Sequence, residues 1–203
     1  MKKSILSLII SILLLVCLTA CEVGEIETTT LAPVEICEKL NGFLNVTYQT
    51  VRLDIATKTG AMELSSSYLL SKDNVEYTVE KMNRLPIDGE MPDTPSGYKT
   101  TLRGTAVIVD GQVTKLDGDE VTLPSYEELR GQFHFDEGNF ENVFSNRKTF
   151  SADVISPSAF YGAEVDMENM HIEVAYSQNA LVSIVITYQT VHSSVTVTYQ
   201  FQK

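Results

Sequence analysis

The last third of the chain alternates between apolar and polar residues. In three successive segments apolar side chains occupy every second position, and polar side chains fill the positions between them. This period of two is typical of a strand that buries one face. Short polar connections separate the segments. We therefore predict three antiparallel strands with one shared apolar face, at residues 170–176, 182–188 and 195–201.

The middle of the chain shows the same alternation in shorter runs that end at turn residues. Asp110-Gly111 is a strong hairpin signal, and Thr59-Gly60 and Lys72-Asp73-Asn74 read as turns. Three prolines and two glycines within residues 83–97 predict a long loop. Six further strands are predicted, at residues 51–55, 62–70, 75–79, 98–109, 112–116 and 149–155.

Helical periodicity is confined to short segments. Pro33 suits the first turn of a helix, and the apolar spacing that follows predicts a helix over residues 34–44. Ser125 and Glu128 have the spacing of a capping box, which predicts a short helix ending near Arg130. Two further helical turns are predicted, at residues 140–144 and 156–162.

These elements predict an α+β fold dominated by an antiparallel sheet of about eight or nine strands in a meander. The apolar face of the sheet must be covered, because a large exposed apolar patch promotes aggregation. The N-terminal helix and the short helices are the natural cover, and the pattern also fits a curved half-barrel. Residues 34–203 have the length of one domain.

The N-terminus, MKKSILSLIISILLLVCLTAC, has two lysines followed by an apolar run. The run is too short for a comfortable membrane span and fits a secretory signal peptide over residues 1–20. Leu18-Thr19-Ala20-Cys21 resembles the lipobox of bacterial lipoproteins. That resemblance implies cleavage between Ala20 and Cys21 and attachment of a diacylglycerol to the Cys21 sulfur. A thiolate is the nucleophile that forms such a thioether.

A lipidated Cys21 would anchor the protein to a bacterial membrane on its extracytoplasmic side, because two acyl chains suffice for stable anchoring. Residues 21–33 then form an acidic, threonine-rich tether. The membrane is thus one expected partner.

The whole of residues 34–203 is also similar in pattern to the LolA-like lipoprotein carriers. The similarity lies in an N-terminal helix, a long antiparallel sheet with one apolar face, and helices over that face. It implies a half-barrel that closes over a hydrophobic cavity for acyl chains. No signature residue of that family is present, so the resemblance assigns no ligand-binding residue. The short helices and the proline-rich loop depart from the family pattern.

Charge and cysteine content exclude some classes. The net charge of −12 argues against nucleic acid as a partner, because nucleic-acid binding needs a basic face. With Cys17 removed and Cys21 lipidated, Cys37 has no cysteine left to pair with, and it is interpreted as a small buried apolar residue.

Few sequence features indicate a catalytic, cofactor-binding or metal-binding site. It has no serine-hydrolase elbow, P-loop or zinc-protease motif, so we expect a non-catalytic protein without cofactor or metal. Serine-rich stretches such as Ser65-Ser66-Ser67 lie on a predicted strand and have no obvious base nearby. His171 and His192 are interpreted as solvated. Acidic clusters at residues 117–120 and 136–142 lack calcium-loop spacing. Five phenylalanines are interpreted as core residues, and a hydrophobic pocket lined by them is the alternative. They are Phe133, Phe135, Phe140, Phe144 and Phe150.

Two functions follow as hypotheses. The first is a surface lipoprotein that binds a hydrophobic or lipid-like small molecule in a cavity of at least about 300 Å³ lined by the apolar strand faces. The second is a structural or adhesive lipoprotein whose sheet is a solid scaffold that presents loops to protein partners.

Overall fold

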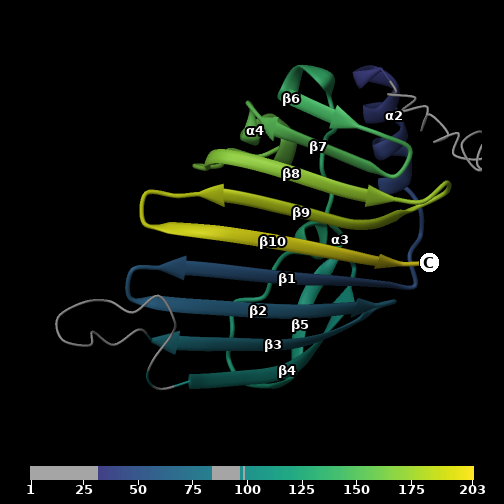
Figure 1. Ribbon diagram of the computed structural model, residues 1–203. Helices are drawn as coiled ribbons and strands as arrows, with labels where there is room; N and C mark the ends of the chain where they lie inside the picture. Colours follow the sequence, from purple (N-terminus) through teal and green to yellow (C-terminus); the bar gives the residue numbers. More distant parts are fainter. Residues whose placement is uncertain (1–31, 84–96, 98) are drawn as a thin grey trace, which may run out of the picture.

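The protein is built on one open antiparallel sheet of ten strands (Figure 1). The computed structural model describes residues 32–83, 97 and 99–203. The predicted α+β class with a dominant antiparallel sheet is confirmed, and the sheet does not close into a barrel. Most of the predicted loop at 83–97 lies outside the described residues.

The strands follow the alternation of the sequence closely. They are β1 (Thr50–Thr59), β2 (Met62–Ser71), β3 (Asn74–Asn83), β4 (Lys99–Val109), β5 (Gln112–Gly118), β6 (Phe140–Ser145), β7 (Thr149–Val154), β8 (Glu168–Tyr176), β9 (Leu181–Gln189) and β10 (Ser193–Gln202). The helical elements are α2 (Pro33–Leu44), α3 (Tyr126–Arg130), the 3-10 turn η1 (Glu137–Asn139) and α4 (Pro157–Tyr161).

The sheet consists of two meanders that meet at its centre. The strand order is β5-β4-β3-β2-β1-β10-β9-β8-β7-β6. The chain therefore runs from the centre at β1 to one edge at β5, crosses to the other edge at β6, and returns to the centre at β10. The central pair is long, with Thr50 opposite Gln202 at one end and Thr59 opposite Ser193 at the other.

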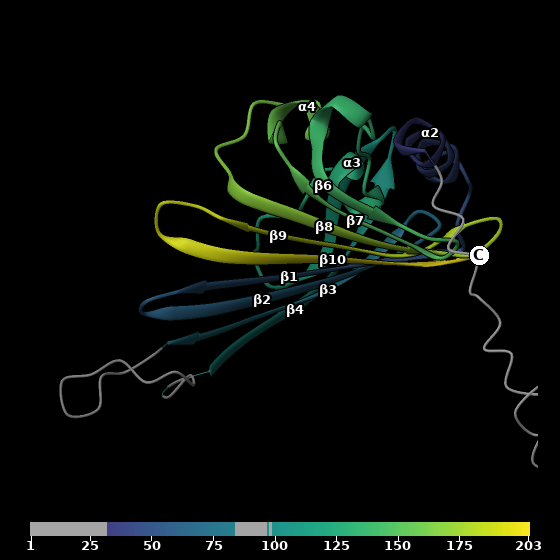
Figure 2. The same cartoon turned by 45° about the horizontal axis from the view of Figure 1, so that its top comes forward.

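All the described helices lie on one side of the sheet (Figure 2). We call the sheet face under these helices the inner face and the opposite face the outer face. Apolar residues alternate onto the inner face, as the period of two predicts. Along β10, for example, Val195, Val197, Tyr199 and Phe201 are buried, while the residues between them face outwards.

The N-terminal helix forms as predicted, with proline in its first turn. Its buried side chains include Ile36, Cys37 and Leu40, which recur at helical spacing. Asn41 fixes the helix to the segment before β6. Its amide donates to the Phe135 carbonyl (2.7 Å), and its carbonyl accepts from the Phe135 N–H (3.1 Å). One side chain thereby satisfies both backbone groups of Phe135.

The capping box at α3 is confirmed. The Ser125 hydroxyl accepts from the Glu128 N–H, and the Glu128 carboxylate accepts from the Ser125 N–H at 2.7 Å. The helix ends at Gly131, which adopts the left-handed conformation. The turn predicted at 156–162 is also confirmed as α4, which ends at Gly162 in the same way.

The helical turn predicted at residues 140–144 is wrong, because this segment is the edge strand β6. A β-bulge interrupts the alternation that would identify this segment as a strand. The register with β7 shifts between Glu141 and Phe144, and Asn142 has a φ of 52°. The extra residue breaks the alternation, so that Phe140 and Ser145, five residues apart, both face inwards. The strand therefore lacks the period of two.

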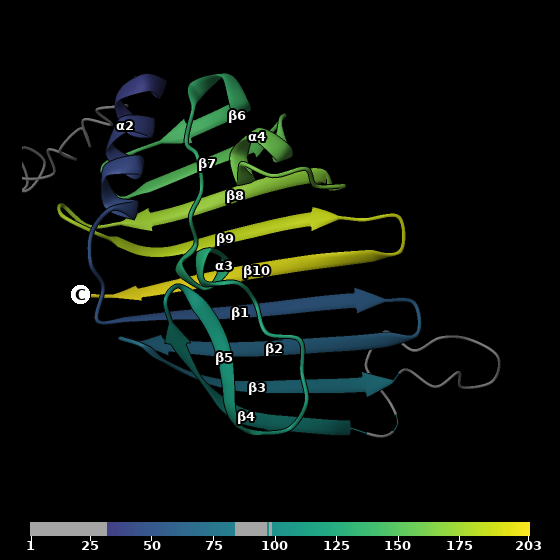
Figure 3. The same cartoon turned by 180° about the vertical axis from the view of Figure 1, so that it is seen from behind.

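The edge of the sheet formed by β4 and β5 turns back over the inner face, as the view from behind shows (Figure 3). Tyr77 on β3 secures this turn, since its hydroxyl donates to the Asp119 carbonyl at 2.7 Å. Gly104 on β4 makes room for the Tyr77 ring. A Cβ at this position would overlap the Tyr77 hydroxyl and the Asp117 carbonyl.

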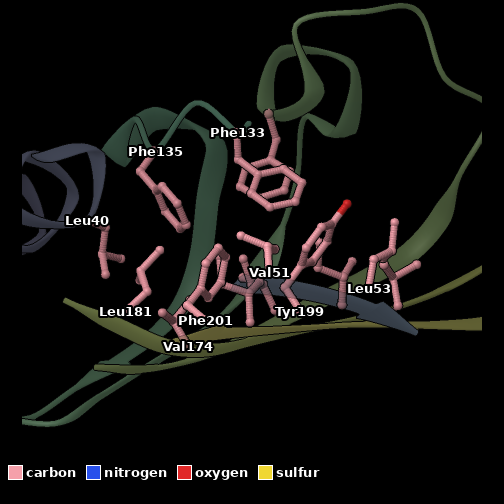
Figure 4. Packing of buried hydrophobic residues seen from close by; sticks show 14 of the residues in the cluster. Leu40, Val51, Leu53, Phe133, Phe135, Val174, Leu181, Tyr199 and Phe201 are labelled. Carbon is pink, nitrogen blue, oxygen red and sulfur yellow. The ribbon is translucent and has the colours of Figure 1, made fainter. Parts of the chain in front are cut away.

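Aromatic side chains fill the space between the helices and the inner face (Figure 4). Phe133 stacks on Phe160 with ring centroids 4.9 Å apart and meets Tyr199 edge-on at 5.4 Å. The Tyr199 hydroxyl donates to the Glu128 carbonyl at 2.7 Å. Burial accordingly raises the pKa of Tyr199 far above its ordinary value. The loop before β6 is thereby fixed to the centre of the sheet.

Candidate functional site

The predicted lipidation site, Cys21 with the cleavage point at Ala20, lies outside the described residues. The described chain begins one residue before α2. Among the described residues, no helix is both long enough and apolar enough to cross a membrane.

The inner face is occupied by side chains from the sheet and its cover. Leu53, Ile172 and Ile184 on the strands and Leu129 and Phe160 on the helices are almost fully buried. The aromatic contacts between helices and strands are direct, as for Phe133 on Tyr199. Around these side chains the helices therefore pack directly on the strands.

The outer face presents two neighbouring hollows over β1, β2 and β3, with volumes of about 610 Å³ and about 380 Å³. Both are lined mainly by hydroxyl and charged side chains. The first is lined by Arg52, Asp54, Ser65, Ser67, Leu69, Glu76, Tyr77, Thr78 and Glu80. The second adds Ala56, Thr57, Lys58, Glu63, Leu64, Met82, Lys99, Ser194 and Thr196.

Several charges in the outer-face hollows form ion pairs with each other. Arg52 binds Asp54 at 2.9 Å, and Lys99 binds Glu80 at 2.8 Å. Exposed pairs of this kind contribute little to stability and exchange easily for other partners. The larger hollow can therefore accept a polar surface, whereas the smaller one also has Ala56, Leu64 and Met82 in its lining.

A second polar group lies on the outer face of β7 and β8. The Ser151 hydroxyl is 3.0 Å from His171 Nε2, and His171 Nδ1 is 2.6 Å from Asp153 Oδ1. His171 is 37% exposed and Asp153 is 43% exposed. The register produces this contact. His171 lies directly opposite Asp153, and Ser151 precedes Asp153 by two residues on the same face of β7.

Asn142 completes this group from the bulge in β6. Its amide donates to Asp153 Oδ2 at 2.7 Å, so both oxygens of the carboxylate have a partner. The hydrogen bonds from Asn142 and then from His171 lower the pKa of Asp153. His171 lies on the polar face of its strand and is partly solvated, as expected, but both of its ring nitrogens also have hydrogen-bond partners.

The other residues singled out in the sequence are dispersed. His134 and His192 are exposed. In the acidic turn after β5, Asp119 accepts from the Arg103 N–H at 2.8 Å, and Glu120 binds Lys115 at 2.6 Å. In the part of the chain that the structure describes, no cluster of histidine, cysteine, aspartate and glutamate side chains has the geometry to bind a metal ion.

Cys37 and four of the five phenylalanines are buried, as predicted. Phe144 is the exception. It is 60% exposed, and its assignment to the core is wrong. The bulge in β6 turns this side chain to the outer face, where it lies opposite Ser151 in the register.

The sequence alone predicts part of the arrangement of Ser151, Asp153 and His171. The alternation in residues 149–155 places Ser151 and Asp153 on one polar face, and His171 is on the polar face of its own strand. The pairing of β7 with β8 and its register were needed to bring them together. No known protein-family model matches the chain, and no curated protein matches its sequence.

Proposed function

We propose that the protein is an extracytoplasmic lipoprotein, anchored to a bacterial membrane through Cys21, whose sheet is a structural or adhesive scaffold for protein partners. The observation that supports the scaffold is the contrast between the two faces of the sheet. The inner face is packed against its cover, whereas the outer face has no helix over it among the described residues and carries polar hollows.

The tether sets the reach of this scaffold. Cys21 and Ala32 are 11 residues apart in sequence, so the segment between them spans at most about 40 Å when fully extended. The domain would therefore remain close to the membrane surface and could meet partners there. The acidic balance of the chain disfavours direct docking onto anionic lipid, so the acyl chains would supply the attachment.

The anchor is tested by growth of the source bacterium, or of a bacterial host, with an alkyne analogue of palmitate. The wild-type protein and the variant Cys37→Ala should both be labelled and should sediment with membranes. The variant Cys21→Ala should lose the label and the membrane association. Label that persists in Cys21→Ala would refute the lipobox assignment.

The choice between scaffold and lipid carrier is tested by native mass spectrometry of the purified mature protein. A scaffold should show the mass of the acylated polypeptide alone. A co-purifying lipid that is absent from a similarly purified control lipoprotein would instead support the carrier function.

A further inference from the structure

Ser151, His171 and Asp153 are connected in the atom order that activates a serine hydroxyl. The hydroxyl meets Nε2 of the imidazole, and the carboxylate meets Nδ1. Asp153 therefore favours the tautomer with its proton on Nδ1, which leaves the Nε2 lone pair free to accept the Ser151 proton. Because the two hydrogen bonds use opposite sides of the ring, the imidazole is held in one orientation.

The supporting contacts fix this geometry from a third strand. Asn142 on β6 holds the second oxygen of Asp153, and the three strands are consecutive at one edge of the sheet. A base that is itself positioned by another group is the arrangement required for nucleophilic catalysis. The half-exposed side chains of His171 and Asp153 leave the group open to a substrate from solvent.

The neighbours of Ser151 indicate the class of substrate. Exposed Phe144 lies directly across from Ser151 on β6 and offers an apolar surface beside the hydroxyl. Glu173 lies across from Ser151 on β8, with its carboxylate 4.0 Å from His171 Nε2. A negative charge at this distance disfavours anionic substrates. A neutral ester with a small apolar acyl group fits both neighbours.

We propose that Ser151 is a nucleophile that takes an acyl group from neutral esters, with His171 as general base and Asp153 as the residue that positions it. Ser151 Oγ attacks the ester carbonyl while its proton passes to Nε2. The C–O bond to the alcohol then breaks, and the alcohol leaves with that proton. Water hydrolyses the acyl-serine by the same path, with Nε2 first accepting and then returning a proton. This reactivity goes beyond the scaffold function and opposes the expectation of a non-catalytic protein.

The test uses the intact mature lipoprotein in detergent micelles and a biotinylated fluorophosphonate. This probe forms an O–P bond with an activated serine and releases fluoride. Wild-type protein should be labelled, and peptide mass spectrometry should locate the label at Ser151. Ser151→Ala should abolish the label, and His171→Gln should slow labelling by about 100-fold, the usual contribution of a general base.

Matched variants separate reactivity from structure. Ser183→Ala removes a similarly half-buried serine from the outer face of β9 and should leave labelling unchanged. Asp153→Asn should slow labelling and alter its pH profile, because the amide no longer favours the Nδ1–H tautomer. Circular dichroism should show that each variant remains folded. With p-nitrophenyl butyrate as substrate, Phe144→Ser should reduce turnover more than it does with the acetate.

Two results would overturn the proposal. One is labelling of folded wild-type protein that is no faster than that of folded Ser151→Ala. The other is a folded His171→Gln variant that reacts as fast as the wild type, because Ser151 would then not depend on its base.

Discussion

At the scale of single residues, Gly104 shows how one missing side chain permits the fold of a whole edge. The Tyr77 ring passes over β4 where Gly104 has no Cβ, and this lets the Tyr77 hydroxyl reach the Asp119 carbonyl. The hydrogen bond from Tyr77 on β3 thus holds Asp119, the residue after β5, in place.

We predict that Gly104→Ala destabilises the protein by about 3 kcal/mol, at the upper end of overpacking penalties, because a backbone carbonyl is among the atoms that must move. Urea denaturation followed by circular dichroism measures the change. Gly42→Ala is the matched control. Gly42 lies in α2 with no atom near its absent Cβ, so alanine there should stabilise the protein by about 0.5–1 kcal/mol. Equal effects at the two positions would contradict the proposed role of Gly104.

Residue-level properties of the candidate site were only partly readable from the sequence. Ser151 and Asp153 could be assigned to one polar strand face, since that follows from alternation alone. Their contact with His171 could not, because a shift of one residue between β7 and β8 would place His171 on the other face. The lipobox is different, since its four residues are adjacent and need no fold to be recognised.

At the scale of elements, α2 covers one end of the sheet. The buried Cys37 thiol on this helix can be used to detect whether the helix is packed in place. Burial, with a smaller contribution from Asp136 and Glu137, raises the pKa of Cys37 to about 11. The folded protein therefore keeps this thiol neutral at pH 8. Because the pKa is raised on folding, the associated stability is complete below about pH 9 and is lost as the pH rises towards 11.

We predict that Leu40→Ala costs about 2–5 kcal/mol, because Leu40 is fully buried between α2 and the core. The same variant should speed the reaction of Cys37 with a thiol reagent at pH 8, since α2 would detach more often. Val34→Ala, at an exposed position of the same helix, should change neither quantity by much. A Cys37 reaction rate that is the same in all three proteins would mean that α2 is not held by Leu40.

Most elements with an intact period could be predicted, whereas β6, in which the period is broken, could not. Nine strands follow from alternation, and α3 follows from its capping box. The strand β6 was missed because its bulge puts Phe140 and Ser145 on the same face. A sequence shows a bulge only as a fault in the pattern.

At the scale of the whole molecule, the two meanders share one core. Buried residues of β2 and β3, such as Tyr68 and Val75, belong to the same cluster as Ile172 and Ile184 on β8 and β9. The halves are therefore expected to unfold together, although each is a continuous run of hairpins.

We predict that native-state hydrogen exchange gives β2 and β9 amides the same free energy of opening, equal to that of global unfolding. Leu53→Ala, at the central β1–β10 pair, should lower both values equally, by about 2–5 kcal/mol. Faster exchange confined to β1–β5 in this variant would show that the meanders are separate cooperative units.

The pairing of the first strand with the last has a consequence for biogenesis. The sheet has no centre until β10 (Ser193–Gln202) lies against β1 (Thr50–Thr59). A chain emerging from the ribosome therefore cannot complete this sheet before β10 has been made. Until then β1 lacks one of its two neighbouring strands. The strand order thus makes folding of the domain depend on a pairing between two segments more than 130 residues apart.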